Sequence, residues 1–250
     1  MTTTAIQLPE QPAAGITPAP APAVELLDLS KSIDDRSILR NINLTIPAGQ
    51  FLAVLGANGT GKSTLLKILS TLMPPSSGEL RLFGQRATAS SVELRRNIGL
   101  IGHQSMLYRD LSASENLQFF AKLYAAADPI RRARQMLEMI GLSERANDPV
   151  KNFSRGMVQR VAIARALLHD PALLLADEPF DGLDAPSIES LEKLLAQLSE
   201  AGKTIVMVNH DIEQSLEIAD HAIVLRGGQL VLDQPTHRLY PREVLSEVRS

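Results

Sequence analysis

The sequence contains no cysteine, and this absence removes several chemistries at once. Disulfide bonds, thiolate metal sites and cysteine nucleophiles all require a thiol, so none of them is available to this chain. A cysteine-free chain fits a reducing compartment, where disulfides do not persist. No run approaches the ~20 apolar residues that a membrane-spanning helix needs. If the protein works at a membrane, another chain must supply the span.

The sequence also has no excess of positive charge, and aromatic residues are few. The 250 residues carry 25 lysines and arginines against 28 aspartates and glutamates, a formal net charge of −3. Because nucleic-acid-binding domains present a basic stripe and this sequence has none, we expect no nucleic acid partner. Of three tyrosines and six phenylalanines, four fall close together, where they form either a local core or a groove for a partner. They are Tyr108, Phe119, Phe120 and Tyr124.

The two ends of the chain differ in composition from its centre. Residues 1–23 are rich in Thr, Ala and Pro and lack the basic start and apolar run of a secretory signal, which predicts a flexible tail. Residues 234–250 are polar, and an amphipathic piece over 239–248 predicts a short terminal helix. We therefore expect one folded domain over residues 24–233, with a tail at each end.

Between the tails, short apolar runs alternate with helical patterns, which predicts an α/β fold. Runs at 24–29 and 42–46 predict a small antiparallel sheet, and a hairpin is expected at 226–229. Three continuous apolar runs predict strands buried on both faces of a parallel sheet: 51–55, 173–176 and 204–208. Residues about 105–160 show helical patterns and no strand, which predicts an all-helical lobe inserted into the sheet domain.

The most specific motif follows the run 51–55 and precedes a leucine-rich helical segment. This is the setting of a phosphate-binding loop, in which glycines expose backbone N–H groups and the helix points its positive end at the phosphates. Lys62 would reach the β- and γ-phosphates of a nucleoside triphosphate, and Ser63 would ligate Mg²⁺. The alternative is a glycine-rich turn that only starts a helix. The predicted loop comprises Gly56, Ala57, Asn58, Gly59, Thr60, Gly61, Lys62, Ser63 and Thr64.

Two carboxylates follow the run 173–176 directly. Asp177 and Glu178 therefore leave the carboxyl edge of the predicted sheet, where α/β folds bind their ligands. Asp177 would hold Mg²⁺, usually through water, and Glu178 would polarise the water that attacks the γ-phosphate. An acidic pair on the surface is the alternative.

With these motifs in place, residues 24–232 resemble the ATP-binding subunits of ABC transporters. The run Phe153-Ser-Arg-Gly-Met157, followed by Gln159-Arg160, stands where that family has its signature motif. The resemblance implies that Ser154 and Gly156 bind the γ-phosphate of a nucleotide held by an opposing subunit, with Arg155 beside it. Taken alone, Ser154 is an ordinary helix N-cap.

The resemblance implies three further roles. Gln104 matches the loop that senses Mg²⁺ and the attacking water, and His210 matches the switch histidine that contacts the γ-phosphate. Asp184 matches the loop that crosses the dimer interface. The predicted catalytic residues are thus Glu178, His210 and Gln104, and the predicted metal site comprises Ser63, Gln104 and Asp177.

The family also implies cofactors, partners and a location. We expect ATP and Mg²⁺, a second ATP-binding domain in a homodimer, and integral-membrane permease subunits, at the cytoplasmic face of the cell membrane. The run from His103 through Tyr124 is similar to the ATP-binding subunit of the haem exporter of cytochrome c maturation. His103 is either a haem ligand or an ordinary polar neighbour in the loop that carries Gln104. Other exporters, a soluble ABC ATPase and a small P-loop kinase are the alternatives.

Three residues depart from the family pattern. Ile33 stands where the family stacks an aromatic ring on adenine, which leaves the preference for ATP over GTP open. Arg155 and Met157 replace the usual glycine and glutamine of the signature, which brings a cation beside the second phosphate site. Arg155 either helps neutralise the nucleotide or faces solvent.

Overall fold

The structure is a computed structural model that describes residues 21–88, 90–102 and 104–249. Most of the expected tail over 1–23 lies outside these residues. Ala23, at the end of that stretch, is buried and its N–H donates to the Ile46 carbonyl at 2.9 Å. Ala23, which the sequence placed in the tail, therefore packs against the rest of the chain.

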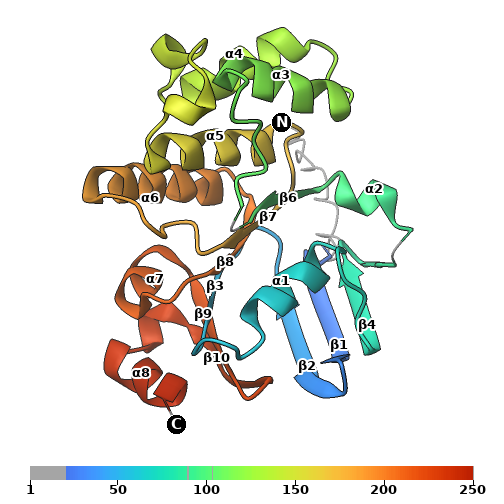
Figure 1. Cartoon of the computed structure of the whole chain (residues 1–250). Helices are drawn as coiled ribbons and strands as arrows, with labels where there is room; N and C mark the ends of the chain where they lie inside the picture. The colour runs from blue at the N-terminus through green and yellow to red at the C-terminus, as the bar shows by residue number, and fades with distance from the viewer. Residues whose placement is uncertain (1–20, 89, 103, 250) are drawn as a thin grey trace, which may run out of the picture.

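A six-stranded sheet forms the centre of the molecule (Figure 1). Its order is β10-β9-β3-β8-β7-β6, and every neighbouring pair is parallel except the β9–β10 hairpin. The strands are β3 (Phe51–Leu55), β6 (Ile98–Ile101), β7 (Leu173–Asp177), β8 (Thr204–Val208), β9 (His221–Arg226) and β10 (Gln229–Pro235). The three apolar runs and the hairpin predicted from the sequence are all present in this sheet.

A second, antiparallel sheet lies beside the first, in blue at the lower right of Figure 1. Its order is β2-β1-β4-β5, formed by β1 (Val24–Ile33), β2 (Arg36–Ile46), β4 (Ser77–Leu82) and β5 (Gln85–Arg86). Patterning alone missed β4 and β6. Both are short, and β6 has only four residues, so its identity as a strand depends on pairing with β7.

Helices cover both faces of the central sheet. The α-helices are α1 (Lys62–Leu69), α2 (Val92–Arg95), α3 (Ala113–Leu123), α4 (Pro129–Met139), α5 (Arg155–Leu167), α6 (Ala185–Glu200), α7 (Ile212–Ile218) and α8 (Pro241–Arg249). Three short 3₁₀ helices are η1 (Ser143–Arg145), η2 (Val150–Asn152) and η3 (Thr236–Arg238). The terminal helix α8 is amphipathic and buries Val244 against the rest of the fold.

Strand β3 shows how the core divides. Successive side chains on a strand point to opposite faces, so Phe51, Ala53 and Leu55 join one buried cluster while Leu52 and Val54 join the other. The first cluster includes residues of α3 to α6 and α8, and the second includes residues of α1, α2 and the antiparallel sheet. The predicted fold class, an α/β sheet with a small antiparallel subdomain and a helical lobe, is thereby confirmed.

Two helices of the helical lobe, α3 and α4, begin at side-chain N-caps. The Ser112 hydroxyl accepts from the Glu115 N–H while the Glu115 carboxylate accepts from the Ser112 N–H, a capping box that starts α3. Asp128 caps α4, whose first residue is Pro129. Figure 1 places α3 and α4 at the end of the molecule opposite α8.

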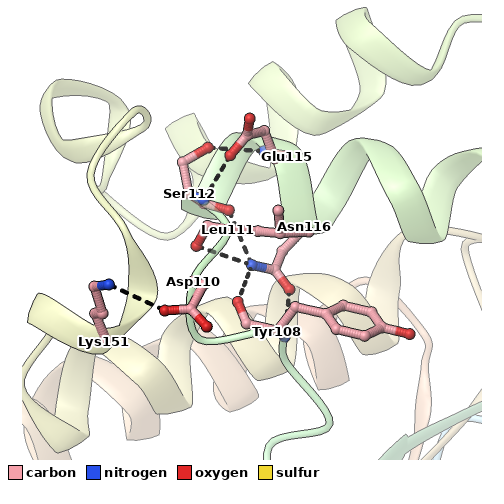
Figure 2. Close-up of polar contacts among 7 residues, drawn as sticks. All are labelled: Tyr108, Asp110, Leu111, Ser112, Glu115, Asn116 and Lys151. Carbon is pink, nitrogen blue, oxygen red and sulfur yellow. Dashed lines mark hydrogen bonds and ion pairs between the residues drawn. The ribbon is translucent and has the colours of Figure 1, made fainter.

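A buried asparagine fixes the turn that enters this lobe (Figure 2). Asn116 is fully buried, and its side-chain oxygen accepts from the Tyr108 N–H at 2.8 Å. Its amide nitrogen lies 2.9 Å from the carbonyl oxygens of both Tyr108 and Ser112. One side chain therefore gives the Tyr108 N–H its acceptor and adds hydrogen bonds to carbonyls that also accept from backbone N–H groups.

The same turn is joined to the segment that leads into α5. The N–H groups of Val150 and Lys151 donate to the Leu111 and Arg109 carbonyls at 3.0 and 2.8 Å. Lys151 also pairs with Asp110 at 3.0 Å, as Figure 2 shows. The entry and the exit of the lobe are thus fastened to each other.

The aromatic cluster of the lobe is divided between core and surface. The Tyr108 and Phe119 rings meet edge to face at 5.2 Å, and the Phe119 ring meets the Phe120 ring at 5.3 Å. Phe120 packs against the core, whereas Tyr108 and Phe119 keep 52% and 43% of their surface exposed. Phe120 therefore belongs to a local core, while the alternative of a groove for a partner stays a prediction for the exposed rings.

We expect Asn116→Ala to lower the free energy of unfolding by about 3 kcal/mol, because the Tyr108 N–H loses its acceptor and the hydrogen bonds of the buried amide nitrogen are lost. Urea unfolding followed by circular dichroism measures this change. Gln118→Ala is the matched control, since the Gln118 amide donates only to the Ser114 hydroxyl on the same helix. Equal losses in the two variants would contradict the role assigned to Asn116.

Candidate nucleotide site

The phosphate loop connects β3 to α1 and is shaped by close backbone contacts. Gly56 has φ +146°, and a β-carbon at this position would lie 2.4 Å from the Leu225 carbonyl oxygen of β9. Only glycine fits there. Helix α1 follows Gly61 directly, so the first N–H groups of the helix, at residues 62–64, face the loop without intrahelical partners. The loop can therefore cradle an anion with backbone N–H groups.

Lys62 lies folded into this loop. Its ammonium group donates to the Gly56 and Ala57 carbonyls at 2.6 and 2.9 Å, and the residue is buried. Burial lowers the pKa of Lys62, while the negative charges of Glu178 and Asp177 raise it in part. A partly desolvated cation of this kind is well suited to pair with a phosphate group.

The two predicted carboxylates meet the phosphate loop at the edge of the sheet. Ser63 donates its hydroxyl hydrogen to the Asp177 carboxylate at 3.3 Å. Glu178 has φ +50°, an unfavourable region for a residue with a side chain, and its N–H donates to the Val208 carbonyl at 2.9 Å. Such strain is common at functional sites because the surrounding structure must impose it.

A cleft of about 600 Å³ brings four predicted site residues together. Ser63, Asp177, Glu178 and Gln104 line it, although they come from three separate segments of the chain. The parallel pairing of β6 with β7 explains the meeting, because both strands end at the same edge and Gln104 follows β6 by three residues. Gln104 thus lies beside the two carboxylates, and the role that the family resemblance implies for it stays a prediction.

The described residues fit the expected ligands of this cleft. The loop offers N–H groups and a cation to phosphate, and Ser63 with Asp177 offers two adjacent oxygen ligands of the hard type that Mg²⁺ prefers. Mg²⁺ usually keeps several waters, so a site with few protein ligands is in keeping with this metal. When bound, Mg²⁺ would neutralise charge that develops on the phosphates.

His210 follows β8 but is not among the residues that line this cleft. It lines a separate hollow of about 410 Å³ with residues of α7 and α8. Sequence reasoning missed the residue that fixes its backbone, the buried Asn209, whose side-chain oxygen accepts from the His210 N–H at 2.9 Å. The sequence did offer a signal for Asn209, because a polar asparagine directly after a continuous apolar run indicates a side chain that binds the backbone of the following turn.

The signature segment forms the start of α5. Ser154 is its N-cap and accepts from the Met157 N–H at 3.3 Å, so the structure bears out the local helix-starting role of this serine. Arg155 lines a third cleft, of about 510 Å³, together with Arg109 and Asp181. None of the signature residues lines the cleft that holds Ser63 and Glu178.

Asp184 starts α6 as its N-cap. Its carboxylate accepts from the Ser187 N–H at 3.2 Å, and the hydrogen bonds with Ser187 lower the pKa of Asp184. This carboxylate is exposed and stays ionised near neutral pH. His103, the residue considered as a haem ligand, lies outside the described residues.

The central parallel sheet, the phosphate loop and the paired carboxylates at its edge define a P-loop nucleoside triphosphatase. The sequence also matches the ABC transporter family over residues 39–181, which is more than half of the chain. The chain belongs to this family, whose cassettes hydrolyse ATP.

Relatives of known name support the same membership. The chain is 34% identical over 227 residues to the ABC transporter ATP-binding protein NatA of Bacillus subtilis, covering 88% of this chain and 92% of that protein. It is 39% identical over 218 residues to the aliphatic sulfonates import ATP-binding protein SsuB 2 of Pseudomonas aeruginosa, covering 87% and 77%.

Solved structures give a similar result. The dimeric post-hydrolysis structure of the ATP-binding cassette MJ0796, bound to ADP and Pi, is 33% identical with a TM-score of 0.76, covering 85% of this chain and 98% of that one. The structure of cbiO1 from Clostridium perfringens, part of the transporter complex cbiONQ, is 26% identical with a TM-score of 0.81, covering 90% and 93%. Within the described residues, no helix is long and apolar enough to cross a membrane.

Ile33 ends β1 opposite Arg36 and keeps 38% of its surface exposed, but it offers no aromatic ring to a base. We expect ATP and GTP to compete for the site within about tenfold, or about 1.4 kcal/mol. Displacement of a fluorescent ATP analogue by each nucleotide measures this ratio.

Ile33→Tyr should raise the preference for ATP, because a ring can stack on adenine. Leu27→Tyr is the matched control, since Leu27 is also exposed on β1. A strong ATP preference in the unmodified protein would show that another group recognises the base.

Proposed function

We propose that this chain is the ATP-hydrolysing subunit of a membrane transporter and that its own residues divide the chemistry as follows. The phosphate loop and Lys62 hold the triphosphate, and Ser63 with Asp177 holds Mg²⁺. Glu178 accepts a hydrogen bond from the attacking water and acts as the general base that takes its proton. The observation that supports this assignment is the meeting of Ser63, Asp177, Glu178 and Gln104 around one cleft.

The hydrolysis step needs positioning and charge, with no covalent intermediate. The backbone N–H groups at the start of α1 face developing negative charge on the phosphates, which they stabilise without moving. The hydrogen bond from the Glu178 N–H to the Val208 carbonyl ties the backbone of Glu178 to β8. Water held between Glu178 and the terminal phosphate would attack the γ-phosphorus as the bond from that phosphorus to the ADP oxygen breaks, and Glu178 would take the proton that the water gives up.

We further propose that two copies of the chain work together. Ser154, Gly156 and Asp184 do not line the cleft of their own subunit, which leaves them available to complete the site of a second copy. The MJ0796 cassette was solved as a dimer, which supports this arrangement. His210 would enter the site when the two copies close.

The proposed membrane partner is a permease subunit at the cytoplasmic face of the cell membrane. Support comes from cbiO1, which is part of a transporter complex, and from relatives named for import and export. The exposed face around Tyr108 and Phe119 supplies apolar surface for such a partner.

For the transported molecule we propose haem, exported for cytochrome c maturation. The support is the similarity of the run 103–124 to that subfamily, while the relatives named above are associated with other substrates. A lipid, polysaccharide or drug exporter is the competing assignment, favoured by relatives such as the Nod factor export protein of Cupriavidus pinatubonensis at 32% identity.

We expect Glu178→Gln to keep ATP affinity within about threefold of the unmodified protein while lowering kcat by at least about 100-fold, because the general base is lost. Steady-state phosphate release and calorimetric ATP binding separate the two effects. The variant should also accumulate as a dimer with ATP in size-exclusion chromatography.

Glu189→Gln is the control, since Glu189 lies on the exposed face of α6 in an ion pair with Lys193. Full turnover by Glu178→Gln would exclude the role assigned to Glu178.

The transporter and its substrate are tested by affinity purification from native membranes, with Glu178→Gln and ATP-Mg²⁺ and mass spectrometry of the bound chains. We expect a small integral-membrane permease encoded with haem-handling proteins. Recovery of a lipid or polysaccharide permease would contradict the haem assignment and favour another exported substrate. Recovery of ribosomes or DNA without a membrane chain would overturn the transporter assignment.

A further inference from the structure

The signature segment and the segment that follows Glu178 meet at two glycines, where a side chain of the other segment lies in the space that a β-carbon would fill. A β-carbon on Gly156 of α5 would lie 2.3 Å from the Ser187 hydroxyl oxygen of α6. A β-carbon on Gly182 would lie 2.6 Å from Nη1 of Arg155. Each segment supplies one glycine and one side chain: Ser187 packs on Gly156, and Arg155 packs on Gly182.

Arg155 makes this contact by packing. Within the described residues its guanidinium forms no hydrogen bond or ion pair, and its terminal nitrogen and its Cδ both lie against Gly182. Asp181 lines the same cleft but does not pair with it. The side chain that departs from the family pattern therefore rests on the backbone of the neighbouring loop.

Gly182 belongs to a run of tight turns that starts at Glu178. The Asp181 N–H donates to the Glu178 carbonyl at 3.2 Å, and the Leu183 N–H donates to the Phe180 carbonyl at 3.2 Å. The run ends at Asp184, the N-cap of α6. A displacement of Gly182 would therefore be passed to Glu178 at one end and to Asp184 at the other.

We propose that Arg155 is a positioning residue that locks the signature segment to the turns 178–184 of its own subunit. Ser154 serves the site of the second copy, whereas Glu178 serves the site of its own subunit. The lock makes the two segments move as one body, so that engagement of Ser154 with one nucleotide aligns Glu178 on the other. This inference rests on the proposed function for the roles of Ser154 and Glu178.

A double-mutant cycle on the full chain tests the lock. Gly182→Ala should lower kcat about tenfold when Arg155 is present, because the new methyl group displaces the guanidinium. With Arg155→Gly already in place the same change should lower kcat only about twofold, which leaves a coupling of about fivefold between the two positions. Strictly additive effects would overturn the proposal.

Gly202→Ala controls for backbone strain. Gly202 has φ +82°, close to the +68° of Gly182, but a β-carbon there meets nothing within 4 Å. Its effect should be the same with and without Arg155. Coupling of Gly202 to Arg155 as strong as that of Gly182 would contradict a local contact.

Arg155→Met separates packing from charge. Methionine keeps a long side chain without the cation, so we expect kcat within about threefold of the unmodified protein, whereas Arg155→Gly should lose about tenfold in kcat with ATP affinity unchanged. If the methionine variant loses as much as the glycine variant, the cation acts directly on the nucleotide and the lock is excluded.

The midpoint of thermal unfolding, which does not depend on hydrolysis, is also measured for the Arg155→Gly and Gly182→Ala single variants and for the double variant. A non-additive shift supports the contact, and an additive one overturns it, even if the unmodified chain shows no ATP turnover. Absence of turnover would instead count against the proposed function.

Discussion

The parallel pairing of β3 with β8 and of β8 with β7 is the constraint on which the candidate site depends. Parallel strands end at one edge, so the phosphate loop, the Asp177–Glu178 pair and the segment around His210 all leave the sheet there. Burial on both faces keeps this edge rigid, because each strand contributes to two core clusters. A loop carrying the same residues without the sheet would lack fixed distances between them.

The site carries features that are unfavourable on their own. Lys62 is buried among carbonyl groups with a lowered pKa, Glu178 occupies a left-handed backbone region, and Gly56 is held against a neighbouring strand. Each arrangement lowers stability and is imposed by the packing around it. A bound triphosphate would pair with Lys62 and with the free N–H groups of α1, so binding relieves part of this cost.

The helical lobe is joined to the site by two connections of different kinds. One is polar and buried, where Asn116 and the backbone of residues 150–151 hold the turn that follows Gln104. The other is a surface contact, where Arg155 packs on Gly182. The first fixes the entry of the lobe to its exit, and the second relates α5 to the turns after Glu178. Both connections therefore join the lobe to the segments that carry Gln104 and Glu178.

The sequence by itself determined the class of chemistry and most of the elements, because the phosphate loop, the strand-capping carboxylates and the apolar runs are local patterns. It left β4 and β6 unassigned, since short strands are defined by their partners, and it gave no role to Asn116 or Asn209. Only the tertiary structure decided where Arg155 rests and that His210 lies apart from the cleft. These are contacts between segments distant in the chain, and local residue patterns do not encode which distant backbone a side chain meets.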